Sequence, residues 1–446
     1  MQFLSDGKNE GIDKMKNFRE FVEKLRKENR MAIAKKSVSK NLDLAGLMHS
    51  LDGCPVYVES VDGSEFSVVG NVFSTRELVC DNLGITKNEL ILKLSNAIDN
   101  PKKIKCIENG PVLENSTEDI DLSRLPIPIY AEKDGGPYLS SAIVVAHDKE
   151  LGYNFSFHRM MVIAKDKVVM RILPRHLEEF IKRAGGELDI VFFVGAPINV
   201  LLSASISSKL GQSELEYANA LGKVETVKLS NGIEVPADCE FAFEGKITSE
   251  MHDEGPFIDL TETYDVVRKQ RIMKVTKMYH RNDALWHVLL PGGLEHKVLM
   301  GMPREPTIFN EVNRICECKR VNITPGGCSW LHAVVAIEKK KENDGKNAIE
   351  AAFAGHKSLK QVVIVDDDID IDNPLEVEWA IATRFQADKD LVVKENQKGS
   401  SLDPSADPNT LATSKMGIDA TKPLKAHGKN FEKAGWKKID PKKFMI

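Results

Sequence analysis

The stretch Met161-Val-Ile-Ala-Lys-Asp-Lys-Val-Val-Met-Arg-Ile172 decides the fold class. Its two apolar runs, rich in β-branched residues, flank a tight turn at Asp166, and this is the pattern of a β-hairpin. Similar short runs recur at 142–146, 190–194 and 241–243. We therefore expect a β-barrel or a strongly curved sheet in the middle of the chain.

The sequence on either side of this region predicts mixed helices and strands. An apolar stripe over 12–30 and the capping box Thr86-Lys-Asn-Glu89 predict two helices. Near the other end, 362–365 predicts a buried strand, and 375–385 predicts a helix after Asn373-Pro374. The expected fold class is α/β in the broad sense, an α+β protein with a β-rich centre.

The length of 446 residues suits two or three domains. We expect an N-terminal α/β domain over 1–110, the β-rich domain over 111–310, and a C-terminal α/β domain over 311–446. The stretch 395–410 is expected to be a loop. The lysine-rich end of the chain is expected either to dock on a partner subunit or to fray.

The composition narrows the classes of partner. The chain has 61 basic and 66 acidic residues and a net charge of -5, which argues against a general nucleic-acid binder and favours small-molecule ligands. Its seven cysteines contain no Cys-x-x-Cys pair, and we find no secretory signal and no membrane span. We expect a soluble cytoplasmic protein.

Six polar residues stand inside segments whose neighbours are mostly apolar: Asn154, Arg159, His176, Glu214, Glu254 and Asp259. Burying such groups costs several kcal/mol unless they meet one another. A common site explains all six with one assumption.

Arg159, Glu254 and Asp259 are the candidates for acid–base chemistry. A guanidinium can hold a carboxylate by two parallel hydrogen bonds, and two acids beside it can have separated pKa values, so that one of them donates a proton. On spacing alone, a structural ion pair explains Arg159 equally well. Two acids near a turn are usually solvated.

Asn154, His176 and Glu214 are the candidates for a metal site. One amide oxygen, one imidazole and one carboxylate suit manganese or magnesium that keeps phosphate or water ligands. His176 and Glu214 also have an ordinary interpretation, because a lone histidine is more often structural and Glu214 opens a predicted helix where a carboxylate is favoured in any case. Walker and Gly-x-Gly-x-x-Gly motifs are absent, which disfavours familiar nucleotide chemistry.

Seven short motifs occur along the chain in the same order as in one protein family. These motifs are Leu125-Pro-Ile-Pro, Asp134-Gly-Gly-Pro-Tyr138, Asn154-x4-Arg159, Glu244-Gly, Glu254-Gly-Pro-Phe, Val365-Asp-Asp-Asp-Ile-Asp370 and Ser401-Leu-Asp-Pro404. Over about residues 110–425 the chain resembles the UbiD family of decarboxylases that depend on prenylated FMN.

The resemblance implies a fold and a set of roles. It implies a central split β-barrel, related to flavin reductases, between two α/β domains, of which the C-terminal one serves oligomerisation. Asn154, His176 and Glu214 match the family's ligands for Mn2+ (or Mg2+, often with K+), which holds the flavin phosphate. Arg159, Glu254 and Asp259 match its catalytic arginine and acids. The flavin-binding set implied here is Asn154, Ser156, Phe157, His158, Arg159, Arg175, His176 and Glu214.

Two positions depart from the family pattern. Ile258 stands where a glycine is common before the final acid, which can move the Asp259 carboxyl group. The loop after Glu214 is about two residues short, so Glu216 stays open as the alternative metal ligand.

The substrate expected from the resemblance is trans-anhydromevalonate 5-phosphate, in isoprenoid synthesis. Arg175, Lys297 and Arg304 are candidates for a basic mouth that would bind its phosphate. The alternatives are a 4-hydroxybenzoate-type aromatic acid, or a non-catalytic flavin-binding subunit. The expected partners are an FMN prenyltransferase, which supplies the cofactor, and further copies of the chain in a dimer or hexamer, with no nucleic acid and no membrane.

Overall fold

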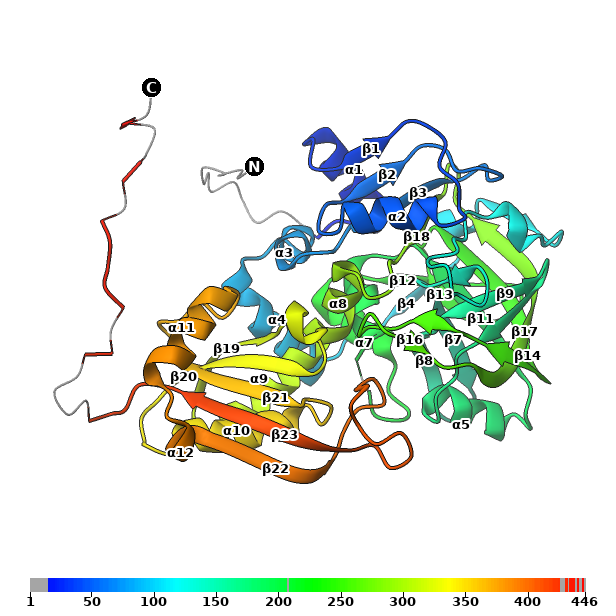
Figure 1. Cartoon of the computed structure of the whole chain (residues 1–446). Helices are drawn as coiled ribbons and strands as arrows, with labels where there is room; N and C mark the ends of the chain where they lie inside the picture. Colours follow the sequence, from blue (N-terminus) through cyan, green and yellow to red (C-terminus); the bar gives the residue numbers. More distant parts are fainter. Residues whose placement is uncertain are drawn as a thin grey trace.

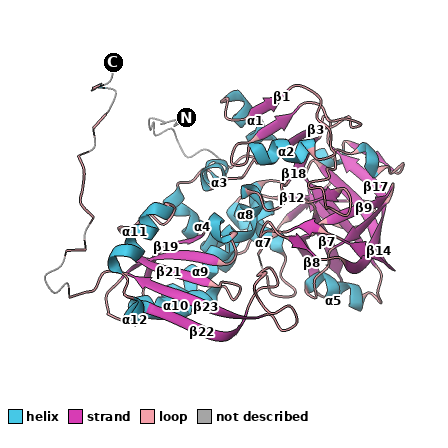
Figure 2. Cartoon of the chain, in the orientation of Figure 1, coloured by secondary structure: helices cyan, strands magenta, loops and turns pink. Residues whose placement is uncertain are grey.

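The chain folds into a mixed arrangement of helices and several sheets (Figures 1 and 2). The computed structural model describes residues 15–206, 208–425, 430–431, 433–437, 439–440 and 443–444. In Figure 1 a small N-terminal layer lies at the top, the sheet with the longest strands lies at the right, and the C-terminal sheet lies at the lower left. The predicted α+β class is confirmed.

The central sheet has nine strands. The order along the sheet is β6 (Tyr138–Leu139), β9 (Met160–Ala164), β10 (Lys167–Met170), β17 (Arg268–His280), β14 (Phe241–Glu254), β11 (Leu188–Val194), β7 (Ile143–Asp148) and β8 (Gly152–Phe157), and β5 (Asn115–Thr117) pairs with β17. The quoted stretch forms the antiparallel pair β9–β10, so the predicted hairpin is confirmed. The split barrel that the resemblance implies stays a prediction.

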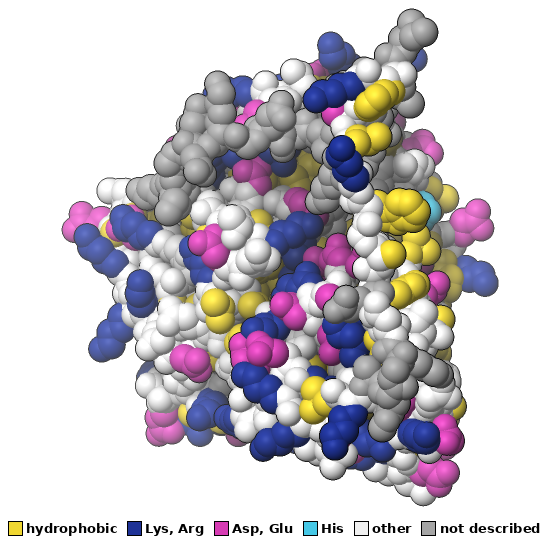
Figure 3. All heavy atoms as spheres, turned by 90° about the vertical axis from the view of Figure 1, so that its left-hand side faces the viewer, with side chains coloured by type: hydrophobic (Ala, Val, Ile, Leu, Met, Phe, Trp, Pro, Cys, Tyr) yellow, Lys and Arg dark blue, Asp and Glu magenta, His cyan; other side chains and the backbone are white. Residues whose placement is uncertain are grey.

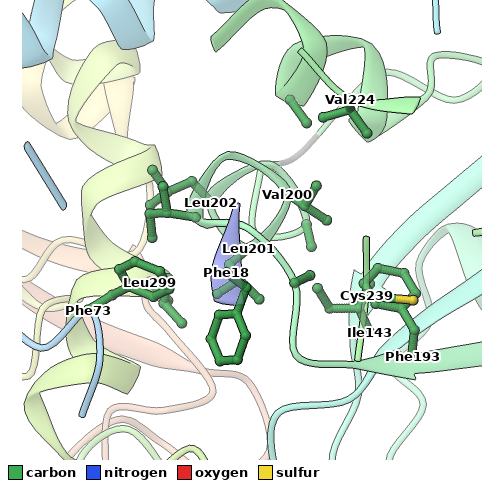
Figure 4. Packing of buried hydrophobic residues seen from close by; sticks show 14 of the residues in the cluster. Phe18, Phe73, Ile143, Phe193, Val200, Leu201, Leu202, Val224, Cys239 and Leu299 are labelled. Atoms are coloured by element: carbon green, nitrogen blue, oxygen red, sulfur yellow. The ribbon is translucent and has the colours of Figure 1, made fainter. Parts of the chain in front are cut away.

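The middle strands of this sheet are buried on both faces. Ile143 and Val145 of β7 pack in one hydrophobic cluster, whereas Val144 and Ala146 pack in another. This alternation follows from the two-residue period of a strand, and it explains why the run is apolar throughout. Figure 4 shows the first cluster, where Ile143 and Phe193 of the sheet approach Cys239.

Helices α1 (Phe18–Lys27), α2 (Asp43–Ser50) and α3 (Arg76–Leu83) belong to the N-terminal layer, and α4 (Lys87–Asp99) follows below them in Figure 1. Helix α1 lies within the predicted stripe 12–30, and α4 has the predicted capping box of Thr86 and Glu89. The sheet of this layer has the order β1 (Ala32–Ala34), β2 (Val56–Val58), β3 (Ser67–Gly70) and β18 (Leu285–Val288). Since β18 comes from much later in the chain, this sheet combines two distant segments. The division at residues 110 and 310 stays a prediction.

The C-terminal sheet has the order β19 (Glu317–Ile323), β20 (His332–Glu338), β21 (Gln361–Asp366), β23 (Ala412–Ala420) and β22 (Leu391–Lys398). Its helices are α9 (Glu305–Asn313), α10 (Asp344–Gly355), α11 (Pro374–Arg384) and α12 (Ala387–Asp390). The predicted strand at 362–365 and helix at 375–385 are confirmed. The prediction of a loop over 395–410 is confirmed for 399–410 and was wrong for 395–398, because β22 continues to Lys398 through its pairing with β23.

Several shorter elements complete the chain. Helices α5 (His176–Arg183), α6 (Ile198–Ser203), α7 (Glu214–Leu221) and α8 (Leu294–Gly301) lie around the central sheet, and β13 (Glu234–Pro236), β12 (Glu225–Lys228) and β4 (Lys105–Ile107) form a small sheet. The hairpin β15 (Phe257–Ile258) and β16 (Tyr264–Asp265) stands apart. Part of the predicted oligomerisation tail, namely 426–429, 432, 438, 441–442 and 445–446, lies outside the described residues.

Basic and acidic side chains are intermixed on the face drawn in Figure 3. No helix among the described residues is long and apolar enough to cross a membrane.

Candidate active site

Arg159 stands between the end of β8 and the start of β9, and its guanidinium points at the end of β14. Its Nε and Nη2 donate to the two oxygens of Glu254 at 2.9 and 3.1 Å. Glu254 is fully buried as the last residue of β14. This two-point contact is the geometry that fixes both the distance and the plane of a carboxylate.

The same guanidinium reaches the hairpin β15–β16. Nη1 donates to Asp259 Oδ2 at 3.0 Å, and Nη2 donates to Asp265 Oδ2 at 2.8 Å. The structure therefore brings together the three predicted acid–base residues. It adds Asp265, which the sequence analysis missed, and whose other oxygen accepts a 2.6 Å hydrogen bond from Arg268.

The electrostatics of this cluster favour a permanently charged arginine. Burial alone would lower the pKa of Arg159, but the hydrogen bonds and charge of Glu254, together with the charges of Asp259 and Asp265, outweigh it and raise the pKa. Each carboxylate has a cationic partner at hydrogen-bond distance. The arginine can therefore orient a further anion only by sharing its donors.

Tyr138 is a second hydrogen-bond donor to Glu254. Its hydroxyl donates to Glu254 Oε1 at 3.0 Å, and its ring stacks on Phe257 at 3.9 Å between centroids. Burial and the negative charge of Glu254 raise the pKa of Tyr138, so that its proton stays in place for this hydrogen bond. Close by, burial raises the pKa of Asp134 to about 6, against the opposing effect of hydrogen bonds from the backbone N–H groups of Ala131 and Tyr130.

Asn154 and Glu214 meet in a second buried cluster. Asn154 Nδ2 donates to Glu214 Oε1 at 3.1 Å, the backbone N–H of Phe155 donates to Oε2 at 2.8 Å, and the Ser208 hydroxyl also donates to Oε1. Burial raises the pKa of Glu214 to about 7, against the opposing hydrogen bonds. Its alternative, Glu216, lies two residues further along α7 and is only half-buried.

His176 opens α5 and is half-buried, and no hydrogen bond joins it to Asn154 or Glu214 among the described residues. Burial and the charge of Arg175 lower its pKa, which favours the neutral ring that can bind a metal ion. No three His, Cys, Asp or Glu side chains of the described residues form a metal-binding group. The predicted ligand set contains only two residues of these four types, His176 and Glu214, and its third member is Asn154.

These residues fit a divalent cation in their chemistry. Glu214 is a carboxylate in a place where burial disfavours its charge, and the nearest groups are an amide and a hydroxyl rather than a lysine or arginine. A bound cation would offset that penalty. The structure brings two of the three predicted ligands into contact, and the third keeps an unprotonated ring.

The residues predicted to line a flavin follow Asn154 along β8. Ser156, Phe157 and His158 are all half-buried. The Ser156 hydroxyl lies 3.0 Å from His158 Nε2, and His158 Nδ1 donates to the Arg171 carbonyl at 2.9 Å. Burial lowers the pKa of His158 to about 4, so this strand presents a hydroxyl, a phenyl ring and a neutral imidazole.

The three predicted phosphate-binding residues divide into a pair and a single residue. Burial and the neighbouring charge of Arg175 lower the pKa of Arg304 to about 10, and the Arg304 guanidinium lies 5.5 Å from the Trp330 ring centroid. The positive charge of Arg175 thus disfavours that of Arg304, and an anion bound by both would offset this repulsion. Lys297 instead forms an ion pair with Glu262.

Comparison with known proteins decides the family. Three family models together match most of the chain, and they are described as the 3-octaprenyl-4-hydroxybenzoate carboxy-lyase N-terminal domain (residues 22–98), Rift-related domain (105–294) and C-terminal domain (297–420). The chain belongs to the UbiD family. As a member of this family, it is a carboxy-lyase.

Two relatives in the UbiD family are both named anhydromevalonate phosphate decarboxylase. The protein from Methanocaldococcus jannaschii is 45% identical over 93% of this chain and 99% of its own length. The one from Methanosarcina mazei is 41% identical over 94% of this chain and 98% of its own length.

Solved UbiD structures agree with the fold. The UbiD-class enzyme HmfF from Pelotomaculum thermopropionicum, in complex with FMN, superposes with a TM-score of 0.91 at 36% identity and covers 97% of this chain and 99% of its own. An evolved dimeric form of HmfF in complex with prenylated FMN gives a TM-score of 0.89 at 34% identity, over 96% of this chain and 100% of its own.

Proposed function

We propose that this UbiD-family carboxy-lyase removes carbon dioxide from trans-anhydromevalonate 5-phosphate without net oxidation, using prenylated FMN. Five archaeal relatives at 39–45% identity carry the name anhydromevalonate phosphate decarboxylase. The observation that carries the proposal is the single guanidinium of Arg159 that holds Glu254 and Asp259 together. This arrangement places a group that can orient an anion, Arg159, in contact with an acid, Asp259.

The reaction converts a carboxylate and one proton into carbon dioxide and a C–H bond. Arg159 would orient the substrate carboxylate, and Glu254 would hold Arg159 in the required plane. Asp259, which is 23% exposed at its side chain, would deliver the proton to the carbon that lost the carboxyl group. Its partial exposure lets solvent restore that proton.

Asn154, His176 and Glu214 would hold Mn2+ (or Mg2+), with K+ as a further candidate, and through the metal the flavin phosphate. Ser156, Phe157, His158 and Arg175 would contact the flavin. When bound, prenylated FMN supplies the electron sink that carbon dioxide release requires. The support from relatives is that HmfF structures contain FMN and prenylated FMN.

Arg175 and Arg304 would bind the substrate phosphate, because two neighbouring guanidinium groups suit a dianion. The partners proposed are an FMN prenyltransferase and other copies of this chain. The cytoplasm is the proposed location, and the seven free thiols of the structure agree with a reducing compartment.

A decarboxylase of an aromatic acid is the second candidate. Its support is a phenolic acid decarboxylase from Sedimentibacter hydroxybenzoicus, 29% identical over 92% of this chain, and a gallate decarboxylase from Lactiplantibacillus plantarum, 28% identical over 78%. The higher identity of the archaeal relatives favours the phosphorylated substrate. A non-catalytic flavin-binding subunit is the third candidate, and the complete Arg159 cluster argues against it.

The test is carbon dioxide release by protein purified from cells that also make an FMN prenyltransferase. We expect turnover of trans-anhydromevalonate 5-phosphate at least 100-fold faster than of 4-hydroxybenzoate, since a lost polar contact alone gives factors of this size. Faster release from the aromatic acid would overturn the substrate. Bound flavin with no release from either acid, and no deuterium exchange into them, would favour the non-catalytic subunit.

A further inference from the structure

The hairpin that carries Asp259 has little support of its own. Its two strands pair only with each other among the described residues, through Phe257 with Asp265 and Ile258 with Tyr264. So short a two-stranded ribbon is not stable by itself. Contacts outside the hairpin must therefore fix the position of Asp259.

The base of the hairpin is held by the active site. Phe257 stacks on Tyr138, and Arg159 bonds both Asp259 and Asp265. These contacts fix the two strand ends. In the turn 260–263, Leu260 is buried and its backbone N–H donates to Asp259 Oδ1 at 2.6 Å, whereas Glu262 and Thr263 are exposed and need a further contact.

The turn is tied to Asp259 through the backbone. The N–H of Glu262 donates to the Asp259 carbonyl at 2.8 Å, and the N–H of Asp259 donates to the Thr263 carbonyl at 3.0 Å. Glu262 has a φ of 62°, a left-handed conformation that a glutamate adopts only when its surroundings impose it. A shift of Glu262 would thus move the backbone of Asp259.

The side chain of Glu262 forms an ion pair with Lys297 of α8. Lys297 is only 8% exposed, and among the described residues Glu262 is the only acid that forms an ion pair with it. The turn before α8 is in close contact with the hairpin, since a Cβ added at Gly292 would lie 2.9 Å from Glu262 Cγ and 3.3 Å from the Asp259 carbonyl oxygen.

Helix α8 is a firm anchor for this contact. The carboxylate of Asp52 accepts from the backbone N–H of Leu294 at 3.0 and 3.1 Å, at the start of the helix. Glu295, which is fully buried, accepts from the backbone N–H of Phe73 at 2.8 Å. Lys297 therefore projects from a helix that is fixed to the N-terminal layer.

We propose that the ion pair between Glu262 and Lys297 is a latch that fixes the hairpin 257–265 against α8 and so positions Asp259 for proton transfer. Both are positioning residues, and neither touches the reacting atoms. The inference rests on the proposed function, in which Asp259 delivers the proton. It adds two residues that the acid–base cluster itself does not contain.

The kinetic test uses Glu262→Ala, Lys297→Met and the charge swap Glu262→Lys with Lys297→Glu in the holoenzyme. We expect either single substitution to lower kcat about tenfold, a cost typical of a misplaced catalytic group, and to leave KM within about twofold because Arg159 stays in place. The swap should restore at least half of the lost kcat. Lys246→Met, which breaks the 2.9 Å surface pair with Glu187, is the matched control and should change neither constant.

Hydrogen exchange of the full-length protein without cofactor gives a second readout, independent of turnover. Amides of 257–265 should exchange at least fivefold faster in Glu262→Ala than in the wild type, and at the wild-type rate in Lys246→Met. Because Glu262 lies at an exposed turn, this variant tests the latch even where Lys297→Met does not fold.

The outcomes separate the latch from the proposed function. Unchanged exchange, or faster exchange with unchanged kcat, overturns the latch. An equal fall of kcat in the Lys246→Met control also overturns it. A wild-type enzyme that releases no carbon dioxide overturns the proposed function and the role of the latch in it, while the exchange result still reports whether the ion pair holds the hairpin.

Discussion

Tyr138 donates its hydroxyl hydrogen bond to the same oxygen of Glu254, Oε1, that accepts from Arg159 Nε. The two donors thus share one acceptor at 3.0 and 2.9 Å, and the carboxylate is fully buried behind them. Since Arg159 Nη2 also holds the other oxygen, Oε2, these contacts fix the rotation of Glu254 and with it the plane of the guanidinium that would receive the substrate.

Tyr138→Phe should lower kcat about tenfold, which corresponds to about 1.4 kcal/mol of lost transition-state stabilisation. The ring and its stacking on Phe257 are kept, so only the hydroxyl contact is lost. The free energy of unfolding should fall by about 1 kcal/mol, the usual net value of one hydrogen bond. Steady-state kinetics and urea unfolding measure the two effects.

The control for this substitution is Tyr57→Phe, in the N-terminal layer, where Arg26 lies over the ring at 4.4 Å. It should leave kcat unchanged. An activity of Tyr138→Phe equal to that of the wild type would show that Arg159 alone fixes Glu254.

Arg159→Ala should abolish decarboxylation while flavin stays bound. Removing one partner of a buried ion pair leaves an uncompensated charge, here Glu254, at a cost of about 3–5 kcal/mol in the free energy of unfolding. Flavin absorbance and metal content of the purified variant, together with carbon dioxide release, check the division of roles.

Arg268→Ala is the control, because Arg268 bonds Asp265 but is more exposed. It should keep most of the activity and bind flavin normally. Loss of flavin from Arg159→Ala would show instead that the cofactor cannot stay bound without Arg159.

Whether the sequence predicts a contact depends on how far apart the two residues are along the chain. The capping box of Thr86 and Glu89 joins residues three apart, so the pattern predicts it directly. The pairing of β3 with β18 joins Ser67 to Leu285, and no local pattern carries such information. Strand positions could therefore be predicted, whereas the composition of the N-terminal sheet could not.

The residues of the active site also include some that the sequence predicts and one that it does not. The cost of burying Arg159 among apolar residues predicts that acids must meet it, and Glu254 and Asp259 do. Asp265 was missed because the strands of its hairpin have two residues each, too short to show an alternating pattern. Its position six residues after Asp259, beyond a Thr-Glu-Thr turn, was the available signal.

Glu214 should make the stability of the metal-free protein depend on pH. Burial raises its folded-state pKa to about 7, above the value near 4.5 of a free glutamate, so the folded state binds the proton more tightly than the unfolded chain does. The contribution is fully present below about pH 4.5 and is lost as the pH rises through 7. It amounts to about 3 kcal/mol at most.

Thermal unfolding in a chelator from pH 5 to pH 8 measures this effect against Glu214→Gln. The melting temperature of the wild type should fall relative to that of the variant as the pH rises. Added Mn2+ should remove the fall in the wild type only. Parallel curves for the two proteins would show that Glu214 is ionised at both pH values and that burial does not penalise its charge.

Arg304→Met should raise KM for trans-anhydromevalonate 5-phosphate at least tenfold with a smaller change in kcat, because the guanidinium would bind the phosphate and not the reacting carboxylate. A charge-assisted contact to an anion contributes about 1.5–3 kcal/mol, which corresponds to a factor of ten or more. Raising the salt concentration should raise KM of the wild type more than that of the variant.

The matched control is Arg314→Met, on the exposed end of α9, where the arginine side chain is 70% exposed and KM should not change. Equal KM values for Arg304→Met and the wild type would place the phosphate elsewhere, and a parallel series on Arg175→Met would show whether that residue binds it alone.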